Sequence, residues 1–380
     1  MTEKVTPFNK PFIIGKEITY IKDCIEHGHL SGNGLFTARC NRFIENQLGS
    51  GKSFMTPSCT ASLELAALLL DIQPGDEVIM PSFTFVSTAN AVVLRGGVPV
   101  FGEIRSDSLN LDESRLEEYL SPRTKAIFPV HYAGNSCDMQ AISTFAKKHG
   151  LYVVEDAAQA FGSTFKGKPV GVVGDMSCFS FHETKNVICG EGGALVVNNK
   201  KFVERAEILQ EKGTNRSQFF RGQVDKYTWV DVGSSFLPSE LQMAFLYAQF
   251  ECADAITQKR ERLCRYYRAR LESLEDKFIQ LPKVIGDCQN NSHIFYILCS
   301  DLKTRNELMT HLKKRGILAV FHYVPLHSSP AGLRLGKTPV ALPVTNKISE
   351  RLLRLPLYYT LTRQQQDIII DAIYTFYGVG

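Results

Sequence analysis

Short apolar runs alternate along residues 12–211 with longer segments in which apolar residues recur every three to four positions. We predict strands at the apolar runs 53–56, 77–80, 98–101, 126–130, 151–155, 176–181 and 194–198. We predict helices at the periodic segments 12–30, 37–48, 63–70, 86–94, 111–119, 139–149 and 201–211. Because strands and helices alternate, the pattern predicts an α/β domain built around a mainly parallel sheet.

The pattern changes near residue 255. A long, charge-rich helix is expected from Ile256 to Leu274, and it is followed by strands at 292–299 and 318–321 and helices at 305–315, 345–353 and 363–376. We therefore assign residues 1–255 to a large domain with an N-terminal helical segment, and residues 256–380 to a smaller α+β domain. Residues 213–229 form a long aromatic and polar segment, which we expect to be ordered against a ligand or a partner subunit.

Composition narrows the classes of function. The chain has 380 residues, a formal net charge of +4 and no basic block, which argues against nucleic-acid binding. No apolar run reaches the roughly 20 residues of a membrane span, and the N-terminus lacks an apolar signal region, so we expect a cytoplasmic protein with no membrane partner. The ten cysteines form no C-x-x-C pair and the nine histidines show no metal-binding spacing, so we expect reduced thiols and no metal site.

Candidate chemistry gathers where the predicted strands end, which is where open α/β sheets bind their ligands. Residues 57–62 turn through small hydroxyl residues into a helix N-terminus, which predicts either a phosphate site or an ordinary N-cap by Ser58 or Thr60. Phe85 stands at a strand-to-helix junction, where it could stack on a flat ring or pack into the core. Asp156 follows an apolar run and has alanines beside it, which favours a site residue over a surface-loop aspartate.

Lys185 lies between an apolar run and the glycines of residues 190–193. A lone lysine is most commonly a solvated surface residue, but a lysine on a structured element can carry a Schiff base. Together with the phosphate turn, the aromatic ring and the acid, it completes the set of groups that pyridoxal 5′-phosphate requires. Burial would depress the pKa of the Lys185 amine, which suits a base near neutral pH.

Several stretches of the chain carry a resemblance to a known family: T-P-S-C-T-A-S-L at 56–63, the segment 74–90, V-E-D-A-A-Q at 154–159, S-F-H-E-T-K-N at 180–186 and G-E-G-G at 190–193. Together they resemble the sugar aminotransferases of the DegT/DnrJ/EryC1/StrS family, and the resemblance extends from about Pro7 to the C-terminus. It implies the fold type I architecture, with a large domain around a mainly parallel seven-stranded sheet and a smaller C-terminal α+β domain. It also implies pyridoxal 5′-phosphate as cofactor and a homodimer with shared active sites.

The resemblance implies roles for individual residues. Lys185 would form the Schiff base and Asp156 would contact the pyridine nitrogen. The other implied cofactor contacts are Gln159 at the 3-hydroxyl, Phe85 on the ring face, and Thr60, Ala61 and Ser180 at the phosphate. The implied substrate contacts lie in loops, and for the histidines a structural role is an equal alternative: His131, Tyr132, Asn215, Arg216, His322, Tyr323 and His327.

One family motif is altered in this chain. Many members have a G-x-N-x-R stretch whose asparagine reaches the phosphate of the neighbouring subunit. Residues 233–237 occupy this place, with Ser235 at the asparagine position and Leu237 at the arginine position. Ser235 could still donate a hydrogen bond across the interface.

Residues 211–229 resemble the subgroup that aminates dTDP-4-keto-6-deoxy-D-glucose. The resemblance thus implies transfer of an amino group from L-glutamate to C4 of this dTDP-sugar with a galacto product, and a gluco product is the alternative. An alternative of another class is a non-catalytic regulator that binds a sugar nucleotide or the cofactor, but no member of the active-site set is missing. Lys185 also argues against the branch of the fold that has histidine at this position and performs dehydration.

Overall fold

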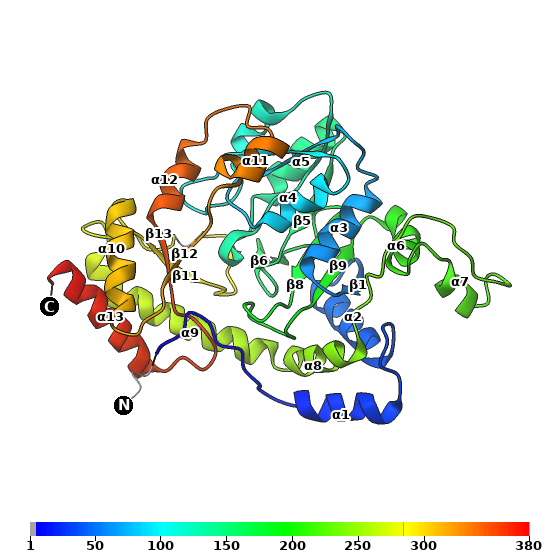
Figure 1. Ribbon diagram of the computed structural model, residues 1–380, viewed down its shortest axis with the longest axis horizontal. Helices are drawn as coiled ribbons and strands as arrows, with labels where there is room; N and C mark the ends of the chain where they lie inside the picture. Colours follow the sequence, from blue (N-terminus) through cyan, green and yellow to red (C-terminus); the bar gives the residue numbers. More distant parts are fainter. Residues whose placement is uncertain (1–4, 284, 380) are drawn as a thin grey trace.

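A seven-stranded sheet forms the centre of the large domain in the computed structural model, which describes residues 5–283 and 285–379 (Figure 1). The strands are β1 (Lys52–Thr56), β2 (Glu77–Pro81), β3 (Val98–Gly102), β4 (Thr124–Ile127), β5 (Tyr152–Asp156), β8 (Met176–Ser180) and β9 (Gly193–Val197). They lie in the order β1-β9-β8-β5-β4-β2-β3, and β9 runs antiparallel to both of its neighbours while the other pairs are parallel. The predicted α/β domain with a mainly parallel seven-stranded sheet is confirmed.

Helices cover both faces of this sheet, which explains why β2, β8 and β9 are buried along their whole length. One face packs against α3 (Cys59–Leu69), α4 (Val86–Val93) and α6 (Val203–Gln210). The other face packs against α2 (Leu35–Leu48), α5 (Met139–His149) and α8 (Glu240–Phe250), and α1 (Glu17–His27) lies on α8. Ser239 begins α8 with a capping box, as its position in the sequence predicts.

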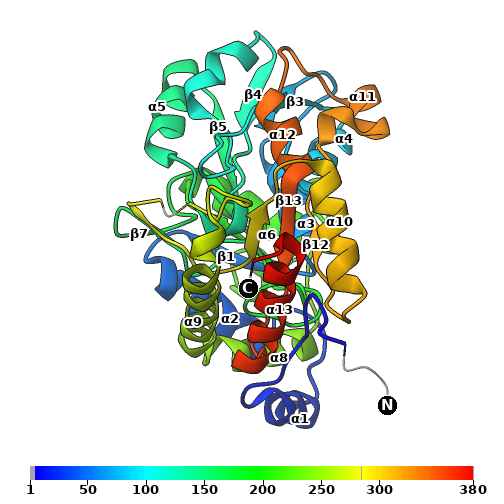
Figure 2. The same ribbon diagram turned by 90° about the vertical axis from the view of Figure 1, so that its left-hand side faces the viewer.

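The C-terminal part of the chain forms a second, smaller core, which faces the viewer in Figure 2. Its sheet has the order β11-β13-β12, with β11 (Phe295–Leu298), β12 (Val320–Phe321) and β13 (Leu352–Leu355) antiparallel to one another. The helices of this part are α9 (Ala253–Leu271), α10 (Leu302–Lys313), α11 (Pro330–Leu335), α12 (Pro343–Arg351) and α13 (Arg363–Tyr377). The domain boundary between residues 255 and 256 stays a prediction.

Some predicted elements were wrong. The helix expected at 345–353 ends at Arg351, and the next four residues form the central strand β13, because a short apolar run fits either period. The helix expected at 111–119 is instead the 3₁₀ helix η1 (Glu113–Tyr119), and the segment expected to be a loop contains α7 (Arg216–Phe220). The remaining short elements are β6 (Thr164–Phe165), β7 (Lys168–Pro169), β10 (Cys288–Gln289), η2 (Tyr132–Gly134), η3 (Lys200–Phe202), η4 (Glu272–Leu274) and η5 (Leu326–Ser328).

Within residues 5–283 and 285–379, none of the helices combines the length and the apolar character that a bilayer crossing requires.

Candidate active site

The carboxyl ends of β1, β5 and β8 meet at one edge of the sheet, and β9 begins between β1 and β8. Gly193, the first residue of β9, pairs with Thr56 on one side and with Ser180 on the other. A Cβ atom on Gly193 would overlap the backbone of Ser58 and Cys59. Glycine is therefore required here for the close approach of β9 to the turn that starts α3.

The turn before α3 can serve both roles predicted from the sequence, the N-cap and the phosphate site. The Ser58 side chain accepts a hydrogen bond from Ala61 N at 3.1 Å and so caps α3. Thr60 lies in the first turn of α3, with its hydroxyl 2.8 Å from the hydroxyl of Ser87, and Ser180 ends the adjacent strand β8. Hydroxyl groups beside the positive end of a helix dipole are suited to a phosphate, so the cradle fits the phosphate of the cofactor.

Asp156 ends β5 and is 4% exposed, which excludes a solvated loop position. Its Oδ2 accepts a hydrogen bond from Thr88 Oγ1 at 2.7 Å, and its Oδ1 accepts one from Ala158 N at 3.2 Å. Burial raises the pKa of the Asp156 carboxyl, and the bond from Thr88 acts against that shift. A protonated ring nitrogen would offset the free-energy cost of burying this carboxylate, which fits the pyridine of the cofactor.

Lys185 lies in the loop after β8, where its backbone N–H donates to the carbonyl of His182 at 2.9 Å. The side chain is half-buried. Burial lowers the pKa of the Lys185 amine, while the nearby Cys59 and Asp156 raise it. A lysine held in this way gives up its proton more readily than a solvated surface lysine.

Lys185 lines one small hollow together with Gln159 and Ser180. Gln159 is buried, and its Oε1 accepts a hydrogen bond from Ala133 N at 2.8 Å while its Nε2 donates to the Tyr323 hydroxyl at 3.0 Å. The structure therefore brings together the predicted lysine, a predicted phosphate residue and the residue expected near the cofactor's 3-hydroxyl.

Phe85 does not pack into the core. It precedes α4, its side chain is 57% exposed, and its ring centroid lies 6.2 Å from that of Tyr323. A large apolar ring left open beside polar groups is available to stack on a flat ligand.

A loop of the C-terminal part covers this edge of the large domain. The Tyr132 hydroxyl lies 2.8 Å from His322 Nδ1, and the rings of His322 and Tyr323 have centroids 3.5 Å apart. His327 Nδ1 lies 2.6 Å from the hydroxyl of Ser82, which follows β2. Burial lowers the pKa of both His322 and His327, so neutral rings are favoured at these positions.

His131 was expected near the substrate, but the structure engages both of its ring nitrogens. Its Nε2 lies 2.9 Å from Glu155 Oε2, its Nδ1 accepts a hydrogen bond from Cys137 N at 3.1 Å, and the residue is 0% exposed. Glu155 also accepts hydrogen bonds from the backbone of residues 171–174. This geometry favours the structural alternative for His131.

The predicted contacts at residues 215, 216 and 235 lie on a different part of the molecule. Arg216 belongs to α7, which projects from the body beyond α6 (Figure 1). Asn215 Oδ1 accepts a hydrogen bond from Thr228 N at 2.8 Å, and the exposed Ser235 pairs through its backbone with Glu211. In this chain these residues contact only neighbouring parts of the segment 211–235. Their role at the active site stays a prediction, and it requires that they reach the active site of a second subunit.

Sequence reasoning missed several residues of the site. Thr88 orients Asp156 from one turn into α4, and buried His293 has its Nδ1 3.1 Å from Asn186 Oδ1. Arg354 interrupts the apolar run of β13, and a charge inside such a run is a signal that could have identified it.

The fold and this site define a pyridoxal 5′-phosphate-dependent aminotransferase of fold type I. The sequence pattern of the DegT/DnrJ/EryC1/StrS aminotransferase family matches residues 11–374, and the chain belongs to this family. It is 32% identical over 375 residues to the spore coat polysaccharide biosynthesis protein SpsC of Bacillus subtilis (strain 168), which covers 97% of this chain and 96% of SpsC.

Solved structures show the same likeness. PseC of Helicobacter pylori, an aminotransferase involved in the biosynthesis of pseudoaminic acid, has a TM-score of 0.90 and 26% identity, with 99% of this chain and 100% of that chain covered. The PLP form of Spr1654, a putative sugar aminotransferase from Streptococcus pneumoniae, has a TM-score of 0.89 and 26% identity, with 98% of each chain covered. The chain is therefore a sugar aminotransferase that uses pyridoxal 5′-phosphate, a sugar substrate and an amino donor.

Proposed function

We propose that this aminotransferase moves the amino group of L-glutamate to C4 of dTDP-4-keto-6-deoxy-D-glucose and forms dTDP-4-amino-4,6-dideoxy-D-galactose. Amino transfer rests on the hollow that Lys185 shares with Gln159 and Ser180, next to buried Asp156. The sugar is inferred from residues 211–229, which resemble the dTDP-4-amino-4,6-dideoxygalactose transaminase of enterobacterial common antigen synthesis, a lipopolysaccharide-type pathway.

When bound, the cofactor supplies an aldehyde that accepts the amino group and a ring that withdraws electrons from the reacting carbon. The Lys185 Nζ would take the proton from the donor carbon that bears the amino group and deliver it to C4′ of the cofactor, and its lowered pKa favours the unprotonated amine that this requires. The Asp156 carboxylate holds the proton of the ring nitrogen, and Thr88 Oγ1 fixes the orientation of that carboxylate. Thr60, Ala61 and Ser180 bind the phosphate.

The aromatic residues above the edge are proposed to receive the sugar. Phe85, Tyr132 and Tyr323 form a wall of neighbouring rings, with Phe85 open for contact with the ligand. His322 and His327 lie in the loop that closes over the wall, where neutral rings can donate or accept hydrogen bonds from sugar hydroxyls.

We infer that the enzyme is a homodimer. The arm formed by residues 213–232 carries exposed Phe220, Tyr227 and Trp229, whose side chains are 70%, 54% and 78% exposed. Large aromatic side chains in such numbers on one projecting segment favour an interface. In this arrangement Asn215, Arg216 and Ser235 reach the site of the partner subunit.

We further propose a cytoplasmic location. The ten cysteines are free thiols in the structure, which favours a reducing compartment.

The product identifies the reaction. Incubation of the enzyme with dTDP-4-keto-6-deoxy-D-glucose and L-[¹⁵N]glutamate should place ¹⁵N on C4 of the sugar, with the small H4 couplings of an axial amine. Large axial couplings at H4 would show the gluco product instead. A sugar product without ¹⁵N, formed while glutamate remains unchanged, would refute the proposed reaction.

A further inference from the structure

The N-terminal strap, residues 5–12, joins the C-terminal part of the chain to the large domain. At its start, Thr6 N donates a hydrogen bond to the Gly316 carbonyl at 2.8 Å, and Leu318 N donates one to the Thr6 carbonyl at 3.0 Å. At its end, Phe12 is buried in the core that α2 and α8 form beside the sheet. Figure 1 shows the strap, in dark blue, passing from the C-terminal part towards α1. Both ends of the strap are therefore fixed.

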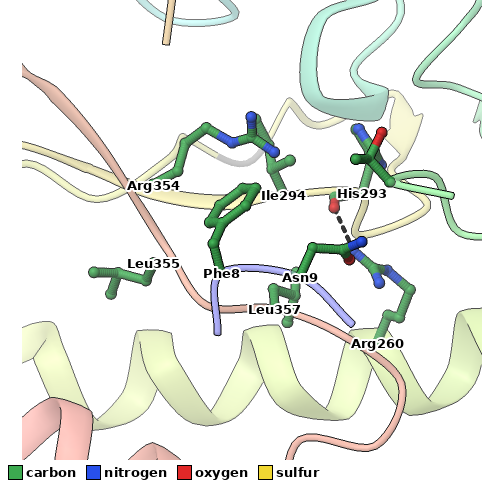
Figure 3. A pocket seen from close by; sticks show the side chains of 9 residues that line it. Phe8, Asn9, Arg260, His293, Ile294, Arg354, Leu355 and Leu357 are labelled. Atoms are coloured by element: carbon green, nitrogen blue, oxygen red, sulfur yellow. Dashed lines mark hydrogen bonds between the residues drawn. The ribbon is translucent and has the colours of Figure 1, made fainter. Parts of the chain in front are cut away.

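Phe8 and Asn9 lie between these two anchors. The Phe8 carbonyl accepts a hydrogen bond from Leu357 N at 3.4 Å, and the guanidinium carbon of Arg354 lies 4.4 Å from the centroid of the Phe8 ring. Because a cation over an aromatic ring is attracted to it, this contact holds the strap against β13. Figure 3 shows the ring of Phe8 directed towards Arg354 and the side chain of Asn9 directed towards Arg260. Phe8, Asn9 and Arg260 line one small hollow.

The amide of Asn9 reaches the loop that carries Lys185. Asn9 Nδ2 donates a hydrogen bond to the Glu183 carbonyl at 3.0 Å, across 174 residues of sequence. Glu183 lies two residues before Lys185, and Thr184 between them lines the same hollow as Asn9. The turn of the loop itself is closed by Lys185 N, which donates to the His182 carbonyl at 2.9 Å. Asn9 therefore ties this loop to the strap, and through the strap to the C-terminal part.

The residue after Lys185 is also tied to the C-terminal part. Buried Asn186 donates from Nδ2 to the Asn291 carbonyl at 2.7 Å, and its Oδ1 lies 3.1 Å from His293 Nδ1. Lys185 is thus flanked by a hydrogen bond from the strap on one side and by hydrogen bonds to the segment before β11 on the other. Since a lysine side chain is long and flexible, the direction of its amine depends on the backbone that carries it. An error of about 1 Å in the placement of a reacting group can lower a rate about 100-fold.

We propose that Asn9 is a positioning residue for Lys185. Its N–H fixes the peptide group that joins Glu183 to Thr184, and this sets the direction in which the chain enters Lys185. Because Asn9 contacts a backbone carbonyl, its effect on the reaction passes through the loop and not through the substrate. The role of Lys185 as carrier of the cofactor rests on the proposed function, whereas the hydrogen bond from Asn9 to the loop is independent of it.

Removing the donor tests the hydrogen bond itself. Asn9→Leu keeps the approximate size of the side chain and its lack of charge, but it has no N–H to donate. In hydrogen-exchange mass spectrometry of the holoenzyme, the backbone amides of residues 183–185 should exchange about 3- to 10-fold faster in this variant, the effect of one lost hydrogen bond. The amides of α5 should exchange as in the wild type, because this helix packs against β5 and η1.

Two further variants separate the hydrogen bond from the packing of the strap. Asn9→Gln retains an amide donor and should recover at least part of the protection from exchange. Lys10→Ala, at the exposed neighbouring residue, is the matched control and should exchange as the wild type.

The half-reaction with glutamate gives a second readout. At saturating glutamate, Asn9→Leu should lower the rate constant about 3- to 10-fold, while the glutamate concentration for half-maximal rate stays the same. Burial lowers the pKa of the Lys185 amine, and a looser loop would expose this amine to more water. The pH at which the rate rises to half its maximum should therefore be higher in Asn9→Leu than in the wild type, and it should be unchanged in Lys10→Ala.

Unchanged exchange at residues 183–185 in Asn9→Leu would overturn the proposal. Equal losses in Asn9→Leu and Asn9→Gln, or in Asn9→Leu and Lys10→Ala, would also overturn it, because they would assign the effect to the packing of the strap. A higher glutamate concentration for half-maximal rate at an unchanged rate constant would place Asn9 against the donor instead. A wild-type enzyme that accepts no amino group from glutamate would refute the proposed donor, and the exchange experiment would still decide whether Asn9 holds the loop.

Discussion

The pKa values of Lys185 and Asp156 differ from those of solvated lysine and aspartate. Burial lowers the pKa of the lysine and raises that of the aspartate, and each charge partly offsets the shift of the other. Thr88 contributes a hydrogen bond that favours the charged carboxylate. The result is an amine that can act as a base and a carboxylate that gains a partner when a protonated ring nitrogen arrives.

Replacing the carboxylate tests this pairing. Asp156→Asn should lower the rate of the glutamate half-reaction by about 100-fold or more, because the ring nitrogen loses the charge that keeps it protonated. The same change should lower the pKa of Lys185 further, since Asp156 raises it. Thr88→Val is the matched variant: it leaves the carboxylate in place, so its loss should be smaller. Equal rates for Asp156→Asn and the wild type, measured by stopped-flow absorbance, would exclude the assigned role.

At the scale of elements, the cradle depends on three neighbouring strands and one helix. Gly193 begins β9 between the ends of β1 and β8, and this lets the turn before α3 approach closely. The cap by Ser58 then orients the N-terminus of α3 towards the same edge. The proposed phosphate site is a property of the packing, and no single segment contains all of it.

Filling the cradle should weaken cofactor binding. Gly193→Ala places a methyl group against the backbone of Ser58 and Cys59, so the turn has to move away from β9. We expect at least a tenfold rise in the dissociation constant of pyridoxal 5′-phosphate, measured by fluorescence titration of the cofactor-free protein. Gly190→Ala is a useful comparison, because its added Cβ meets no atom within 4 Å although its φ of +82° carries strain. If both variants lost the same affinity for the cofactor, backbone strain would explain the loss, and a contact with the turn before α3 would not.

The sequence predicts helices and strands best where residues at both ends, such as helix caps, mark the boundaries. α5 has the predicted bounds because Asp138 caps its start and Gly150, with φ 67°, ends it. Residues 352–355 carry no such signals, and their pairing with β11 and β12 is decided by contacts far along the chain. The same holds for the site: Asp156 and Lys185 stand at strand ends that a pattern reveals, whereas the contact of Thr88 with Asp156 spans 68 residues and appears only in the fold.

At the scale of the whole molecule, the two parts of the chain meet over the site through polar contacts. Tyr132 with His322, Gln159 with Tyr323, and Ser82 with His327 each join one residue of the large domain to one in the loop 322–327. Buried His293 lines one small hollow with Gln159 and Lys185. The site is thus complete only when both parts are folded and in contact.

This arrangement predicts sensitivity to acid. Burial lowers the pKa of His293 and His322 well below 6.5, so the unfolded chain binds protons that the native protein does not. The free energy of unfolding should therefore fall as the pH is lowered from 6.5 to about 5. Chemical denaturation at both pH values should show this slope, and His293→Asn should flatten it, whereas His27→Asn at an exposed histidine should not. A slope that His293→Asn leaves unchanged would contradict this explanation.

The account depends most on Lys185 as the residue that carries the cofactor. Reduction of the purified holoenzyme with borohydride, followed by peptide mass spectrometry, should find the cofactor fixed on the peptide that contains Lys185. Lys185→Ala should be colourless and should transfer no amino group. Cofactor fixed on another lysine, or amino transfer at the wild-type rate by Lys185→Ala, would contradict the account.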